Sequence, residues 1–159
     1  GVVVAELNRA QVLELYAMRE VLEGTAARFA AQHADAAEID LMHDLLNQEA
    51  RALDDSKQSA RINRDLHSTI YSAARNRYLL STLNVLGNAL ALLQGTTFSV
   101  PGRPEQGLKE HRVLVEAIAA RKGDDAEAAA RKHIARARQT RLKMLYGSDG
   151  STLRETASS

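Results

Sequence analysis

Apolar residues recur every three to four positions along most of the chain, the spacing of an α-helix with one buried face. Residues that typically begin a helix stand between these runs: Asn8 with Gln11, and Asp35 with Glu38, have the spacing of a capping box. The chain shows no hairpin signal and no internal repeat. The pattern therefore predicts six helices, at about 8–32, 35–54, 59–75, 77–97, 104–122 and 124–146.

The predicted boundaries rest on glycine, proline and capping residues. Pro101 and Pro104 flank a glycine and mark the clearest loop, since proline stops a helix. Gly123 suits the position after the fifth helix, Asp124 suits the cap of the sixth, and Gly147 should end it. With such short connections, the helices should pack as antiparallel neighbours in an all-α bundle.

Composition narrows the chemistry. The 159 residues are enough for one domain with a substantial core. Because cysteine is absent, only histidine and carboxylate remain as strong metal ligands, and a reducing cytoplasm is the expected location. A net charge of +1 creates no field that would attract nucleic acid. No apolar run approaches the roughly 20 residues that span a bilayer, so we expect no membrane partner.

Three of the five histidines lie in the apolar stripes of their predicted helices. His111 is in the middle of the stripe on the fifth helix, and His133 is in the middle of the stripe on the sixth. His67 shares the edge of the third stripe with Asn63, four positions earlier. A single inward histidine is usually a hydrogen-bonded core residue. Inward placement alone therefore does not indicate a metal site.

The three inward histidines should lie at one depth. His111 lies 12 residues before Gly123 and His133 lies 10 after it, or roughly 18 and 15 Å from the same end at about 1.5 Å per residue. His67, nine residues before Asn76, lies at about 14 Å if the helices alternate in direction. Such a layer favours a divalent metal, with Zn²⁺ or Ni²⁺ suited to imidazole. A structural polar cluster is the alternative.

Arg19 is a fourth inward polar residue, because apolar residues surround its position on the first helix. It has two interpretations. It pairs with Glu23 one turn later, or its guanidinium binds a carboxylate ligand, the geometry that arginine matches best. A metal and an arginine facing one cavity would hold a small organic acid from two sides.

The other polar features are typical of surfaces. His33 and His43 fall at a helix end and on a polar face. A basic run between Arg131 and Lys143 alternates with alanine, as on a solvated helix face. Leucines wrap much of the fourth helix, which suggests either a subunit contact or burial within the monomer.

Four motifs occur in order: the opening helix at residues 15–23, Asn63 with His67, Glu110-His111 followed by Leu114, and His133-Ile134. Together they resemble the C-terminal effector domain, the FCD domain, of FadR-like regulators in the GntR superfamily, over nearly the whole chain. By this resemblance, residues 1–7 are the end of a preceding winged-helix DNA-binding domain and residues 8–146 are the effector domain. Residues 147–159, which lack periodicity, form a disordered tail.

The resemblance implies a bundle, usually dimeric, in which a small carboxylic acid coordinates a bound divalent metal. It implies that Asn63, His67, His111 and His133 are the metal ligands and that Arg19 contacts the effector. Aspartate is the commoner first ligand in the family. The neutral carbonyl of Asn63 should therefore weaken metal binding and leave the site one charge more positive.

These observations support three functional hypotheses. The leading one is a ligand-sensing and dimerisation domain of a transcription regulator, which is not an enzyme and reaches DNA only through a winged-helix domain. The second is a metal-dependent hydrolase-like enzyme, which is disfavoured because Glu23 is the only inward carboxylate expected near the histidines. The third is a purely structural dimerisation bundle.

Overall fold

The computed structural model describes residues 6–147 and contains six α-helices and one 3₁₀ turn in that range, without strands. The expectations for residues 1–5 and 148–159 lie outside the described residues. The elements are α1 (Arg9–His33), α2 (Ala36–Ala50), α3 (Ser56–Ala73), α4 (Arg77–Leu90), η1 (Thr97–Ser99), α5 (Arg103–Ala119) and α6 (Gly123–Tyr146). The predicted all-α fold is confirmed.

The predicted capping boxes form at the starts of α1 and α2. Asn8 accepts a hydrogen bond from the main-chain N–H of Gln11, and the Gln11 side chain accepts one from Asn8 in return. Asp35 and Glu38 exchange the same pair of bonds. These local pairings define where α1 and α2 begin.

Several of the predicted helix ends are wrong. α2 ends at Ala50 rather than 54, and α4 ends at Leu90 rather than 97, because the chain turns there toward Gly95, whose φ is 75°. Asp124 does not cap α6, which begins at Gly123 without a side-chain cap. The left-handed residue after α5 is Arg121, with φ 60°, and not Gly123.

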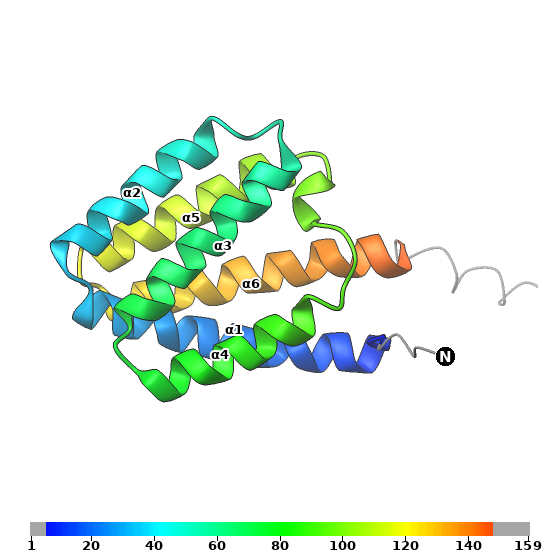
Figure 1. Ribbon diagram of the computed structural model, residues 1–159, viewed down its shortest axis with the longest axis horizontal. Helices are drawn as coiled ribbons and strands as arrows, with labels where there is room; N and C mark the ends of the chain where they lie inside the picture. The colour runs from blue at the N-terminus through cyan, green and yellow to red at the C-terminus, as the bar shows by residue number, and fades with distance from the viewer. Residues whose placement is uncertain (1–5, 148–159) are drawn as a thin grey trace, which may run out of the picture.

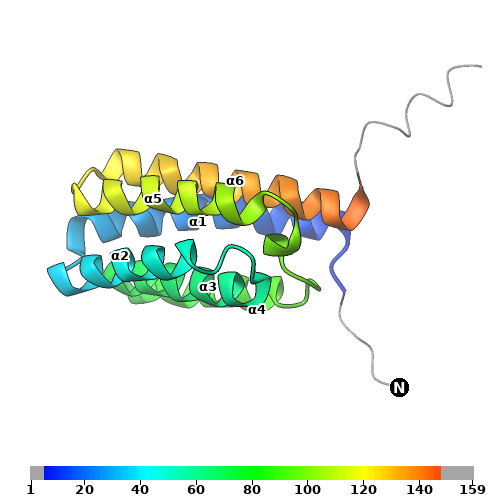
Figure 2. The ribbon, with the colours of Figure 1, turned by 90° about the horizontal axis from the view of Figure 1, so that it is seen from above.

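Successive α-helices alternate in direction, so the bundle is antiparallel (Figures 1 and 2). α1 packs against α3, α4, α5 and α6, and α2 packs against α3 and α5. The largest cluster of core residues draws on all six α-helices and is built mainly from alanine, leucine and isoleucine. This arrangement turns one face of each of α3, α5 and α6 toward a common interior region.

α4 is the least enclosed helix in the described range, with Leu79 and Leu83 as its buried residues. Tyr78 and Val85 are 78% and 63% exposed. Within residues 6–147, no helix is both long and apolar enough to cross a membrane.

Candidate metal centre

His67, His111 and His133 converge in the bundle from α3, α5 and α6, and all three are buried. One nitrogen from each imidazole lies within 4.8 Å of the other two. The ring centroids of His111 and His133 are 4.5 Å apart, and that of His67 is 5.5 Å and 5.3 Å from them. The single layer expected from the sequence is therefore present.

Each histidine is held on its outer side by a buried glutamate. His67 Nδ1 lies 3.0 Å from Glu23 Oε2, and His133 Nδ1 lies 2.7 Å from Glu110 Oε1. His111 Nδ1 lies 2.9 Å and 2.8 Å from the two oxygens of Glu49. A carboxylate accepts hydrogen bonds and does not donate them, so Nδ1 is the donor in each pair.

The Nδ1 bonds leave the Nε2 atoms facing one another. In a neutral imidazole that donates from Nδ1, Nε2 carries a lone pair. His111 Nε2 and His133 Nε2 are 3.2 Å apart, so two lone pairs meet unless a cation lies between them. Metal–nitrogen bonds of about 2.0–2.1 Å at octahedral to tetrahedral angles place two nitrogens roughly 2.8–3.4 Å apart, a range that includes this distance.

Two further polar atoms in the same region lack a partner. His67 Nε2 and Asn63 Oδ1 are both buried without a hydrogen bond. They lie one turn apart on α3, where an i, i+4 pair shares a face. A group of three imidazole nitrogens and one amide oxygen, carried by α3, α5 and α6, fits a divalent metal ion.

The surroundings of His133 and Glu110 keep the imidazole neutral and the carboxylate charged. Burial lowers the pKa of His133 to about 3, with help from His111 and His67 and against the opposing effect of Glu110. His133 is therefore neutral at physiological pH, the form that binds metals. Burial by itself would raise the pKa of Glu110, but the bonds from His133 and Arg103 lower it to about 2.

Glu23 connects the site to α1 and to Tyr71. Burial would raise its pKa, but His67, Arg19 and Tyr71 together lower it to about 2. Tyr71 donates a hydrogen bond to Glu23 Oε1, and Arg19 Nη2 lies 3.7 Å from the same oxygen. Carboxylate partners of this kind set the tautomer and direction of a metal-binding imidazole.

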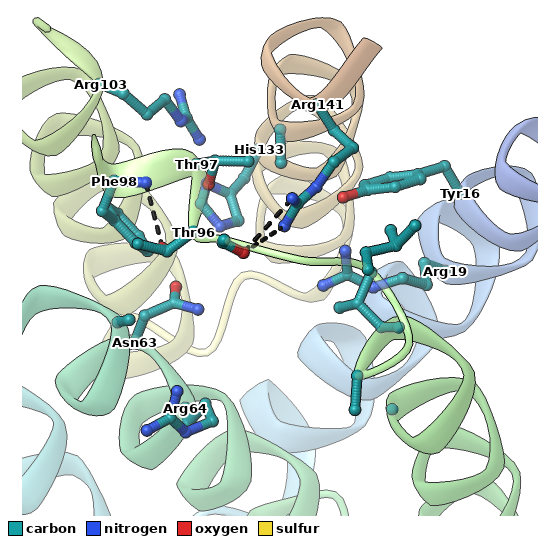
Figure 3. A pocket seen from close by; sticks show the side chains of 17 residues that line it. Tyr16, Arg19, Asn63, Arg64, Thr96, Thr97, Phe98, Arg103, His133 and Arg141 are labelled. Atoms are coloured by element: carbon teal, nitrogen blue, oxygen red, sulfur yellow. Dashed lines mark hydrogen bonds between the residues drawn. The ribbon is translucent and has the colours of Figure 1, made fainter. Parts of the chain in front are cut away.

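Arg19 forms the pair with Glu23 that one interpretation of the sequence predicted, and its contact with a carboxylate ligand stays a prediction. Arg19 also lines two adjacent cavities beside the histidines, each of about 320 Å³. Asn63 lines both cavities as well, while His133 lines the first and His67 the second. Figure 3 shows Arg19, Asn63 and His133 around the first cavity.

The family-model comparison matches residues 14–136 to the FCD domain. The chain belongs to the FCD domain family. FCD domains are the effector-binding regulatory domains of GntR-family transcription regulators and are not enzymes, as the sequence suggested. No curated protein sequence gives a significant match.

Solved structures share the fold of this FCD domain at low sequence identity. McbR/YncC from E. coli is 16% identical with a TM-score of 0.76, and the match covers 88% of this chain and 68% of that one. A Streptococcus agalactiae GntR protein is 20% identical with a TM-score of 0.70, and the match covers 81% of this chain and 58% of that one. This chain therefore spans little more than half of the second protein.

The structure also contains site residues that the sequence did not indicate. Contrary to the expectation that Glu23 is the only inward carboxylate near the histidines, Glu49 and Glu110 are also buried beside them. Arg103 is buried and forms a bidentate pair with Glu110, at 3.0 Å and 2.9 Å. Arg141 was expected on a solvated face, but it is 6% exposed and lines the first cavity.

A sequence signal for two of these residues exists in their spacing. Glu49 lies three positions after Leu46 and seven after Met42, within the buried stripe of α2. Arg141 lies eight positions after His133, again on one helix face. The charge of these side chains conceals the pattern when only apolar residues are counted.

Proposed function

We propose that this FCD domain senses a small carboxylic acid that coordinates a divalent metal, Zn²⁺ or Ni²⁺, held by Asn63, His67, His111 and His133. The observation that carries the proposal is the set of Nε2 atoms directed at one another, each imidazole being fixed by a glutamate on Nδ1. The bound metal would supply a Lewis-acidic position for a carboxylate oxygen.

The cavities beside the histidines are suited to binding a small carboxylic acid. Their volumes of about 320 Å³ are at the lower end of the usual range for ligand sites, so a small molecule fits. Arg19 stands at both cavities with its guanidinium over the Tyr16 ring, 5.2 Å from the ring centroid. A positioned guanidinium beside the metal would select a carboxylate.

The arrangement favours a sensor over a hydrolase. Glu49 and Glu110 contact the outer nitrogens of His111 and His133 and line neither cavity. Glu23 lines the second cavity, but its carboxylate is bound by His67 and Tyr71. None of the residues that line the first cavity within the described range is acidic. In a complete regulator, acid binding would change the DNA affinity of a winged-helix domain, with a coupling of about 1–3 kcal/mol.

Citrate and lactate are suitable probes for the sensing function. The zinc-loaded protein should bind at least one of them by calorimetry, and protein stripped by a chelator should not, because the carboxylate loses its Lewis-acidic partner. Arg19→Gln should weaken binding by roughly 10-fold or more, the effect of one charge-assisted hydrogen bond. Equal acid affinity with and without metal would contradict the proposal.

Arg28→Gln is the matched control for this measurement. It makes the same change on α1, but Arg28 pairs with Asp124 and Glu127 and lines neither cavity. Acid binding by the control should equal that of the unmodified protein.

We also propose that the domain forms a homodimer through its exposed apolar surface on α4 and α1. Tyr78 and Val85 on α4, and Met18 and Val21 on α1, are between 43% and 78% exposed. These two helices pack against each other. Val85→Glu should shift the sedimentation coefficient from dimer to monomer while leaving metal binding unchanged; a dimer that persists would place the interface elsewhere.

A further inference from the structure

Arg141 is a buried cation whose only hydrogen-bond partners among residues 6–147 are main-chain carbonyls. Its Nη1 donates to the oxygens of Gln94, at 3.0 Å, and Gly95, at 3.4 Å, and its Nη2 donates to Gly95 at 3.3 Å. Its Nε is buried and has no partner. A guanidinium removed from water is costly unless an anion compensates it.

Arg19 and Arg103, the other arginines at the site that are largely shielded from solvent, have acidic partners. Arg103 forms two hydrogen bonds with Glu110, and Arg19 lies beside Glu23. No carboxylate in the described part of the chain pairs with Arg141, although it is 94% removed from solvent. The positive charge of Arg141 is therefore uncompensated within the described protein.

Arg141 and His133 line the same cavity from one face of α6. Their separation of eight residues corresponds to roughly 12 Å along the helix axis. Long side chains of a helix point back toward its N-terminus, so the guanidinium of Arg141 extends toward His133. Figure 3 shows Arg141 reaching in from α6, with Asn63 on α3 at the opposite wall.

We propose that Arg141 is a second anion-binding position, and that the effector of this domain is a small acid with two anionic groups. This proposal rests on the proposed function: one carboxylate coordinates the metal, and the second anionic group, a carboxylate or a phosphate, binds Arg141. The cavity of about 320 Å³ limits the ligand to a small molecule. Arg64, which also lines the cavity, adds to the positive potential.

The second anionic group would be linked through Arg141 to the connection between α4 and η1. The guanidinium of Arg141 also holds the carbonyls of Gln94 and Gly95, in the connection between α4 and η1. Thr96 and Thr97 in the same connection line the cavity. The ligand is therefore coupled through Arg141 to the segment that covers it.

The test compares ligands that differ only in the second charge. Zinc-loaded protein is titrated by calorimetry with succinate, with glutarate and with their monomethyl esters, and 3-phosphoglycerate serves as the acid with a phosphate end. Each diacid should bind roughly 10- to 100-fold more tightly than its ester, as expected for one charge-assisted arginine contact. In Arg141→Gln this preference should disappear, whereas the ester affinity should stay the same.

Two further variants separate ligand binding from folding. Arg141→Lys keeps the charge and should retain part of the preference, while Arg138→Gln makes the same change on α6 outside both cavities and should retain all of it. If Arg141→Gln does not fold, the comparison of diacid with ester in the unmodified protein still tests whether a second anionic group adds affinity. Tight binding of 3-phosphoglycerate with weak binding of the diacids would assign the second group as phosphate and support the proposal.

Three outcomes overturn the proposal. Equal affinity for diacids and esters, with both requiring the metal, would reject the second anion position and leave the metal-dependent sensor intact. An equal loss of diacid and ester binding in Arg141→Gln would mean that Arg141 only holds the 94–95 segment. Failure of every acid to bind the zinc-loaded protein would reject the sensor together with this inference.

Discussion

His111→Ala should abolish metal binding and destabilise the metal-free protein. Loss of one of three imidazole ligands should reduce metal affinity by more than the roughly 10- to 100-fold that removal of an orienting partner costs. Glu49 is 1% exposed, and His111 is its hydrogen-bond partner. An unpaired buried carboxylate costs about 3–5 kcal/mol of the free energy of unfolding. Elemental analysis after dialysis measures the metal content, and urea unfolding measures the change in the free energy of unfolding.

Two variants make this result specific. His33→Ala removes an exposed histidine and should retain metal and stability. The double variant Glu49→Gln/His111→Ala removes the buried charge together with the imidazole, so it should recover part of the lost stability but none of the metal binding. Full metal occupancy in His111→Ala would exclude His111 as a ligand.

Zn²⁺ or Ni²⁺ should raise the unfolding temperature by on the order of 10 °C. A ligand present at about 1,000 times its dissociation constant, and bound only by the folded state, adds about 4 kcal/mol to the free energy of unfolding. In a chain of this size each kcal/mol shifts the midpoint by roughly 2–4 °C. Differential scanning calorimetry of chelator-treated protein, with and without added metal, measures the shift.

Two controls test whether the shift in unfolding temperature comes from the histidines: a different ion, Mg²⁺, and the variant Glu49→Gln. Mg²⁺ prefers oxygen ligands and should leave the midpoint unchanged, since three of the four proposed ligand atoms are nitrogens. Glu49→Gln keeps the imidazoles but weakens the support of His111 Nδ1, so at a fixed zinc concentration the shift should be smaller. An equal shift with Mg²⁺ would mean that the stabilisation does not come from the histidine layer.

Much of the fold could be predicted because it depends on local interactions. The capping boxes at Asn8 and Asp35 are satisfied by residues three positions away, so their residue pattern is enough. The end of α4 was predicted wrongly because it depends on a contact with a distant helix. Leucines continue to Leu93, but the carbonyls of Gln94 and Gly95 are bound by Arg141 from α6, an interaction that periodicity does not register.

The common depth of the histidines could also be predicted, since distances from a turn determine height in an antiparallel hairpin. His111 and His133 flank a single turn, and their Nε2 atoms meet at 3.2 Å. None of the glutamate partners on Nδ1 was predicted, although Glu23 was expected near the histidines. Glutamate in a helix normally faces water, and Glu49 faces inward because α2 packs against α5.

The six-helix bundle and the inward layer of His67, His111 and His133 follow from the residue pattern alone, because helical period and capping are local. The order of the motifs was enough to suggest the family. The glutamate on each Nδ1 and the burial of Arg141 without an acidic partner within the described residues became visible only in the folded chain. Burial of a charged side chain depends on which distant helix covers it, and no local pattern contains that information. Those contacts direct the imidazole nitrogens inward, and they leave one cation for a ligand to neutralise.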